Sequence, residues 1–123
     1  MAGKLILIVE DDENSRMLLR DVLQLNEYRT VEAHTAEAGV ALAQQQLPAL
    51  ILMDINLPGM NGIEALRQLR REQATAGIPV VAVTASVMND QQQEAMTAGF
   101  DAFERKPISV LGLLQTVRKL LAR

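Results

Sequence analysis

Cysteine is absent from the 123-residue chain, and histidine occurs once, as His34. The lack of cysteine excludes a disulfide scaffold, a cysteine-ligated zinc site and thiol catalysis. One histidine is too few for a multi-histidine metal site, and its place after a short apolar run indicates a structural or exposed residue. Aromatic residues make up only 2 %, namely Tyr28, Phe100 and Phe103. Because apolar residues still make up 49 %, we expect an aliphatic core.

Long hydrophobic runs and an excess of basic charge are also missing. The first apolar run, Leu5 to Val9, is too short for a signal peptide or a membrane span and ends in acidic residues. The net charge of −3 argues against nucleic acid as the main partner. Because nothing resembles a linker, we expect one domain over residues 1–123 with no output domain. We expect the protein to be cytoplasmic, to make no contact with membranes, and to be a monomer or weak dimer.

Five short apolar runs alternate with amphipathic segments of helical period. The runs are Leu5–Val9, Thr30–Ala33, Ala49–Met53, Val80–Val83 and Ala102–Phe103, and the segments are 15–26, 36–46, 63–72, 90–98 and 109–122. The first, third and fourth runs are almost continuously apolar, which is typical of strands buried on both faces of a parallel sheet. The second and fifth are more polar, so we place them near the edges. The alternation predicts an α/β fold, (βα)₅, with a doubly wound five-stranded parallel sheet and helices on both faces.

Polar side chains follow four of the predicted strands where each strand ends. The acidic run 10–13 follows the first strand, Asp54 the third, Thr84 the fourth and Lys106 the fifth. Ligands of such sheets bind beyond the carboxyl ends of the strands, so we expect carboxylates, a hydroxyl and an ammonium to meet there. Clustered carboxylates repel one another, and Mg²⁺, which prefers oxygen ligands, relieves that repulsion. These groups predict a phosphoryl-transfer site in which Asp54 attacks and Thr84 and Lys106 bind the phosphoryl group.

Each of these residues has a plainer interpretation when it is taken alone. The acidic run suits the start of a solvated helix, and Asp54 suits a turn before Pro58 and Gly59. Thr84 is typical of a helix N-cap, and Lys106 is typical of a surface lysine before a helix-starting proline. The three arginines of segment 63–72 are interpreted as a solvated helix face; they are Arg67, Arg70 and Arg71.

Four ordered segments resemble the receiver domain of response regulators in two-component signalling. They are Val9-Glu10-Asp11-Asp12, the stretch from Leu52-Met53-Asp54 to Asn61-Gly62, Val83-Thr84-Ala85, and Lys106-Pro107. The resemblance covers essentially the whole chain. The chain is similar to stand-alone cell-division and chemotaxis regulators within that family. It implies a flavodoxin-like strand order of 2-1-3-4-5, and it favours a cis peptide at Lys106-Pro107.

The resemblance also implies a role for individual residues. Asp54 is the expected phosphoacceptor, with Thr84 and Lys106 as its catalytic partners. Mg²⁺, or Mn²⁺ in its place, is expected on four residues: Asp12 directly, Asp11 largely through water, Asp54, and the backbone carbonyl of Asn56. Thr84 and Phe103 are the expected switch residues. Access and hydrolysis are expected to be tuned at three positions, Asn56, Ala85 and Ser86.

These roles imply a phosphorylation-activated switch. A sensor histidine kinase or a histidine phosphotransfer protein is expected to supply the phosphoryl group from a phosphohistidine. The fourth helix, fifth strand and fifth helix are expected to change their surface for a downstream protein partner. The chain is then no enzyme beyond its own phosphorylation and dephosphorylation. Two alternatives remain: a pseudo-receiver that only binds partners, and an aspartyl-phosphate phosphatase or phosphotransferase. The latter typically has a second acid where this chain has Asn56.

Overall fold

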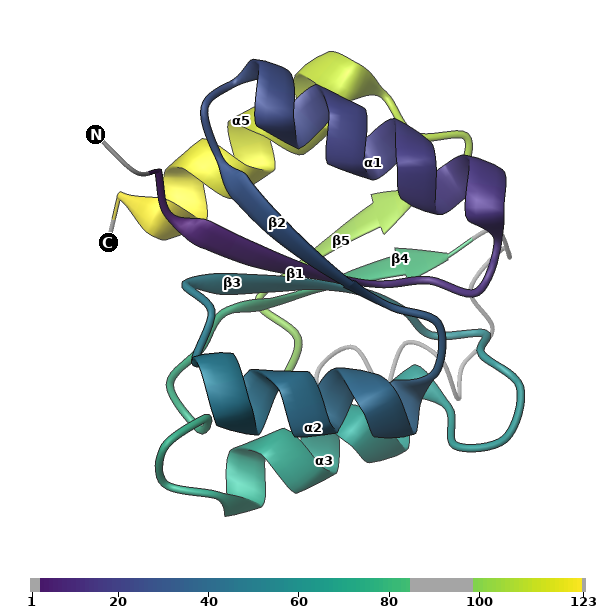
Figure 1. Cartoon of the computed structure of the whole chain (residues 1–123), viewed down its shortest axis with the longest axis vertical. Helices are drawn as coiled ribbons and strands as arrows, with labels where there is room; N and C mark the ends of the chain where they lie inside the picture. The colour runs from purple at the N-terminus through teal and green to yellow at the C-terminus, as the bar shows by residue number, and fades with distance from the viewer. Residues whose placement is uncertain (1–2, 85–98, 123) are drawn as a thin grey trace.

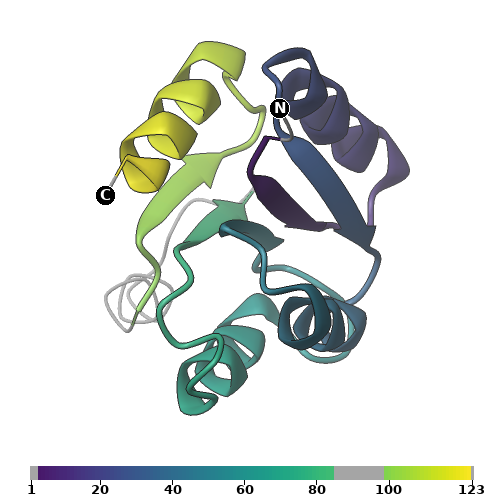
Figure 2. The same cartoon turned by 60° about the vertical axis from the view of Figure 1, so that its left-hand side comes forward.

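The computed structural model describes residues 3–84 and 99–122. Five parallel strands form one sheet in the order β2-β1-β3-β4-β5, which confirms the expected topology. The strands are β1 (Leu5–Val9), β2 (Arg29–Ala33), β3 (Leu50–Asp54), β4 (Val80–Thr84) and β5 (Ala102–Arg105). The helices are α1 (Glu13–Leu25), α2 (Ala36–Gln46), α3 (Gly62–Arg71) and α5 (Val110–Leu121). Helices α1 and α5 cover one face of the sheet, and α2 and α3 cover the other (Figures 1 and 2). The helix expected at 90–98 lies outside the described residues.

The central strands are buried on both faces, which explains their continuous apolar runs. Alternate residues of β1, such as Leu7 and Val9, face the cluster with α2 and α3. The residues between them, such as Ile6 and Ile8, face the cluster with α1 and α5. Among the described residues, the buried hydrophobic side chains are all Leu, Ile, Val, Ala or Met. The expected aliphatic core is therefore confirmed.

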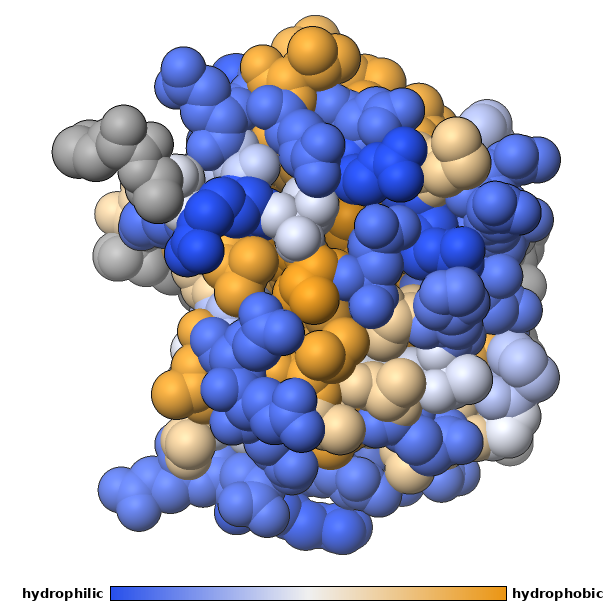
Figure 3. Space-filling model, in the orientation of Figure 1, coloured by the Kyte–Doolittle hydropathy of each residue, from blue (hydrophilic) through white to orange (hydrophobic). Residues whose placement is uncertain are grey.

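The edge strands are β2 and β5, as their polarity predicted. Strand β5 extends beyond the expected Ala102–Phe103 to include Glu104 and Arg105. In its register Arg105 pairs with Thr84 of β4. Backbone hydrogen bonds to β4 therefore extend the strand through polar residues, which the hydrophobic pattern of the sequence does not predict. Seen from the β2 side, apolar side chains gather between α1 and α2 and are surrounded by hydrophilic ones (Figure 3). None of the helices in the described part of the chain is long and apolar enough to cross a membrane.

The arginine face on α3 is only partly solvated. Arg67 and Arg71 are exposed as expected, but Arg70 is not free in solvent. Its Nη1 donates to the carbonyls of Ala76 and Ile78 at 3.0 and 2.7 Å. Its Nη2 donates to the carbonyl of Gly99 and to Asp101 Oδ2, each at 3.0 Å. The interpretation of Arg70 as a solvated residue was wrong, because the connection into β4 and the start of β5 supply acceptors that the helical pattern does not reveal.

Replacing Arg70 with methionine is expected to lower the free energy of unfolding by about 2–3 kcal/mol. The variant leaves carbonyls without their charged donor, and hydrogen bonds to charged groups contribute about 1.5–3 kcal/mol each. Urea denaturation of the wild type, Arg70→Met and Arg71→Met measures this. Arg71→Met is the matched control on the same helix and should stay within about 0.5 kcal/mol of wild type. Equal losses in the two variants would contradict a clamping role for Arg70.

Candidate functional site

Side chains from four strand ends meet at the carboxyl edge of the sheet. Glu10 directly follows β1, Asp54 is the last residue of β3, and Thr84 is the last residue of β4. Lys106 follows β5, and its backbone N–H donates to the carbonyl of Thr84 at 2.7 Å. Parallel pairing thus brings together residues that lie far apart in the sequence, as the strand-end pattern predicted.

Asp54 is the centre of this group. Its side chain is 7 % exposed and is held at both carboxylate oxygens. Oδ1 accepts the backbone N–H of Asn56 at 2.8 Å, and Oδ2 accepts Lys106 Nζ at 3.2 Å. Glycine at position 62 lets the start of α3 lie close to the backbone of Asp54, because a Cβ there would lie 2.8 Å from the Asp54 carbonyl oxygen. The carboxylate therefore has a fixed orientation at the end of a buried strand.

Lys106 bridges two carboxylates. Its ammonium donates to Glu10 Oε1 as well as to Asp54 Oδ2. Burial disfavours the charge, but the hydrogen bond to Glu10 and the charges of Asp54 and Glu10 outweigh it, so the pKa of Lys106 is raised. The Lys106-Pro107 peptide is cis, as the resemblance favoured. The ammonium is thus a permanent positive charge directed at Asp54.

Three carboxylates form a cluster beside this lysine. Oxygens of Glu10, Asp11 and Asp54 lie within 4.8 Å of one another. Glu10 is 1 % exposed, and its Oε2 has no hydrogen-bond partner within the described ranges. Burial, together with Asp54, raises the pKa of Glu10 to about 7. Sequence reasoning missed Glu10, although its position immediately after a buried strand is the signal that could have identified it.

Asp12 does not join the carboxylate cluster. Its Oδ2 accepts the backbone N–H of Ser15 at 2.8 Å and caps α1. This contact with Ser15 also holds the pKa of Asp12 below its ordinary value. Of the expected pair, Asp11 therefore lies in the carboxylate cluster, and Asp12 lies at the N-cap of α1. The end of β1 places Glu10 and Asp11 in the cluster, and Asp12 is the N-cap residue just before α1 begins at Glu13.

The other predicted site residues lie nearby or outside the described residues. Asn56 is exposed in the loop after β3, and its Nδ2 donates to the buried Thr84 Oγ1 at 3.0 Å. Phe103 is half-buried in β5, where it pairs with Ala82. Ala85 and Ser86 lie outside the described residues. His34 is exposed, as predicted.

The composition of the site fits a hard divalent cation. When all three carboxylates are ionised, one ammonium leaves two negative charges uncompensated, which equals the charge of one Mg²⁺. The buried Glu10 Oε2 is an acceptor still in need of a partner. Mg²⁺ takes oxygen ligands, uses few carboxylates and retains waters. The residues present therefore suit Mg²⁺ in donor type and in charge.

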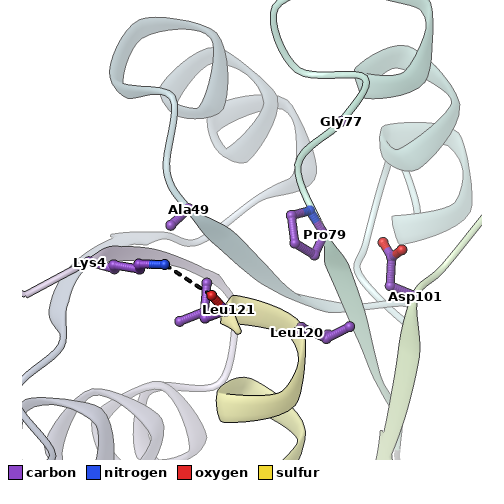
Figure 4. Close-up of a pocket in the computed structure, with 7 residues that line it drawn as sticks. All are labelled: Lys4, Ala49, Gly77, Pro79, Asp101, Leu120 and Leu121. Atoms are coloured by element: carbon purple, nitrogen blue, oxygen red, sulfur yellow. Dashed lines mark hydrogen bonds between the residues drawn. The ribbon is translucent and has the colours of Figure 1, made fainter. Parts of the chain in front are cut away.

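A second hollow, of about 240 Å³, lies at the opposite end of the strands (Figure 4). Its lining residues Lys4, Ala49, Pro79 and Asp101 each directly precede a strand. Lys4 Nζ donates to the carbonyl of Leu121 at 3.0 Å, and Asp101 Oδ2 accepts from Arg70 and from the Val80 N–H. The charged groups of this hollow are therefore already engaged within the fold, whereas the carboxylate cluster lies at the carboxyl edge of the sheet.

Comparisons with known proteins agree with this geometry. Residues 6–118 match the family described as the response regulator receiver domain. The chain is 36 % identical over 118 residues to the polar-differentiation response regulator DivK of Brucella ovis, covering 96 % of each protein. The DivK of Brucella anthropi is equally similar, at 36 % identity with the same coverage.

Solved structures of similar chains share the fold. The receiver domain of sensor histidine kinase PA1611 from Pseudomonas aeruginosa PAO1 matches with a TM-score of 0.92 and 26 % identity, covering 99 % of this chain and 100 % of that one. That structure holds a magnesium ion coordinated in its active site cleft. Vibrio cholerae chemotaxis protein CheY4 matches with a TM-score of 0.89 and 25 % identity, covering 97 % and 99 %.

Proposed function

Because the chain belongs to the response regulator receiver family, the phosphorylation-based switches of two-component signalling, we propose that it accepts a phosphoryl group on Asp54 and signals through a separate protein. The observation that carries the proposal is the carboxylate of Asp54, buried and held at both oxygens beside Lys106. A nucleophile fixed in this way needs little reorganisation before it attacks.

The donor in this proposal is a phosphohistidine of a sensor histidine kinase or of a histidine phosphotransfer protein. A carboxylate oxygen of Asp54 forms a bond to phosphorus while the phosphorus–nitrogen bond of the donor breaks, and the electron pair returns to the imidazole. Lys106, already hydrogen-bonded to Asp54, stabilises the charge on the phosphoryl oxygens. The Thr84 hydroxyl, also at this edge of the sheet, supplies a further hydrogen bond.

We assign the magnesium site to Asp11, Asp54 and the backbone carbonyl of Asn56, with Glu10 as an acceptor for metal-bound water. When bound, Mg²⁺ supplies positive charge that offsets the phosphoryl oxygens. Asp12 has no part in this assignment, because it caps α1.

The switch in this proposal begins at Thr84. Phosphorylation replaces a carboxylate with a group of higher negative charge and more acceptor oxygens. The Thr84 hydroxyl, which now accepts from Asn56 at 3.0 Å, turns toward those oxygens, and Phe103 moves inward from its half-buried position. The surface that includes β5 and α5 changes for a downstream protein. A differential interaction of a few kcal/mol is enough to invert such an equilibrium.

The surroundings of Lys106 support a protein donor over a small diffusible one. A hollow of about 190 Å³ beside Lys106 is lined largely by apolar residues, including Leu18, Pro107 and Ile108. Leu18 is 45 % exposed on α1. An apolar surface next to the lysine offers contact area that a partner protein can cover during transfer.

A phosphorylation assay tests the proposed function. The protein is incubated with a phosphorylated histidine phosphotransfer protein, or with a small acyl phosphate, in Mg²⁺ or in EDTA, and its intact mass is recorded. We expect one acid-stable, base-labile phosphoryl group in Mg²⁺ and none in EDTA or in Asp54→Asn. No adduct from any donor would contradict the proposal and favour a pseudo-receiver. Rapid release of phosphate from many phosphoesters would instead indicate an aspartyl-phosphate phosphatase.

A further inference from the structure

Arg16 of α1 is a buried arginine outside the site residues discussed so far. Its residue exposure is 8 %, and its guanidinium reaches two neighbouring elements. Nη1 donates to the backbone carbonyl of Glu10 at 3.0 Å. Nε lies 3.3 Å from Glu32 Oε1 on β2. Arg16 thereby links the first helix, the turn after β1 and the edge strand.

We infer that Arg16 is a positioning residue that fixes the β1–α1 turn so that Glu10 and Asp11 point to the metal site, an inference that rests on the proposed function. The carbonyl that Arg16 binds belongs to the peptide plane between Glu10 and Asp11. A peptide unit is planar, so a hydrogen bond to its oxygen restrains the orientation of the plane that joins the Cα atoms of Glu10 and Asp11.

The turn needs such a restraint because its carboxylates repel one another. Glu10, Asp11 and Asp54 lie within 4.8 Å, and Lys106 provides a single ammonium between them. The Glu10 N–H is tied to the carbonyl of Ala33 at 3.0 Å, and Asp12 is tied to Ser15 at 2.8 Å. The hydrogen bond from Arg16 restrains the peptide between these two hydrogen-bonded residues, and Asp11 belongs to that peptide.

Charge and orientation predict opposite effects of removing Arg16. A positive charge near a cation site weakens binding of that cation, so loss of charge alone predicts tighter Mg²⁺ binding. Loss of a fixed turn predicts weaker binding, as when outer partners of metal ligands are removed, at a cost of about 10–100-fold. Because Glu32 already offsets the charge of Arg16, we expect orientation to dominate.

The test measures Mg²⁺ affinity of the full chain by isothermal titration, with the free energy of unfolding recorded in parallel. We expect Arg16→Met to bind Mg²⁺ about 10-fold more weakly than wild type. Arg20→Met is the matched control, because Arg20 lies on the same helix and pairs only locally with Asp21 within the described part of the chain. Its affinity should stay within about twofold, since exposed charges are screened by salt.

Two further variants separate positioning from a general loss of stability. Arg16→Lys keeps a donor that reaches the Glu10 carbonyl and should recover at least half of the lost affinity, expressed as log Kd. The double variant Arg16→Met/Glu32→Gln also removes the Glu32 charge that Arg16→Met leaves uncompensated. It should still bind Mg²⁺ weakly. Unchanged or tighter binding by Arg16→Met, with wild type binding normally, would overturn the role of Arg16 alone. Failure of the wild type to bind Mg²⁺ would overturn both this inference and the proposed function.

Discussion

Asp11→Asn is expected to weaken Mg²⁺ binding by about 100-fold or more, whereas Asp12→Asn should leave it within about twofold of wild type. Asp11 belongs to the carboxylate cluster with Glu10 and Asp54, and its replacement removes a charged oxygen ligand. Asp12 caps α1, and asparagine is as good an N-cap as aspartate, so Asp12→Asn preserves both the helix and the site.

The two variants are a matched pair because each removes one negative charge from adjacent positions of the same turn. Isothermal titration with Mg²⁺ measures the affinities, and intact mass at a fixed limiting Mg²⁺ concentration measures phosphoryl uptake. Uptake should be lost in Asp11→Asn and retained in Asp12→Asn. The reverse pattern would restore the ligand pair expected from the sequence and refute the assignment made from the structure.

In Mg²⁺-free buffer, the free energy of unfolding of wild type is expected to fall by about 2–3 kcal/mol between pH 5 and pH 8, and that of Glu10→Gln is expected to fall much less. The pKa of Glu10 is raised from 4.5 to about 7, chiefly by burial, so the fold favours the protonated form. This contribution is complete below the unfolded-state pKa of 4.5 and is lost as the pH rises through about 7. A neutral glutamine does not ionise and loses nothing over that interval.

Urea denaturation at pH 5 and pH 8 in EDTA measures the difference. Wild type should lose stability between these values, and Glu10→Gln should lose much less. Burial also raises the pKa of Glu104, but that contribution is present in both proteins and cancels in the comparison. Glu13→Gln, at an exposed position of the same acidic run, is the control and should titrate like wild type. An identical pH dependence in Glu10→Gln and wild type would contradict the assigned burial effect.

The sequence predicted the sheet well because buried parallel strands leave a strong hydrophobic pattern. Strands β1, β3 and β4 are apolar on both faces, so their positions could be read within a residue. The end of β5 could not, because Glu104 and Arg105 are held by backbone pairing to β4, which is independent of side-chain type.

The sequence predicted at which strand ends the polar groups meet, but not which residues of the acidic run face the sheet. Asp54 has no acidic neighbour that competes for its role, and the structure brings it into contact with Lys106. The acidic run offers four carboxylates in a row, and which of them faces the sheet depends on where the strand stops and α1 begins. The contacts of Arg16 and Arg70 could not be predicted either, since their acceptors include backbone carbonyls that no side-chain pattern encodes.

In the proposed function, the placement of Asp54, Thr84 and Lys106 at strand ends separates the reacting groups from the surfaces that contact partners. These groups are held by the backbone of the sheet, whereas exposed residues such as Met17 and Leu18 lie on the outer side of α1. Two proteins of this architecture can therefore keep the same reacting groups while their helix surfaces diverge freely. If they use the proposed reaction, several such proteins can share one phosphoryl-transfer step while their different helix surfaces select different partners.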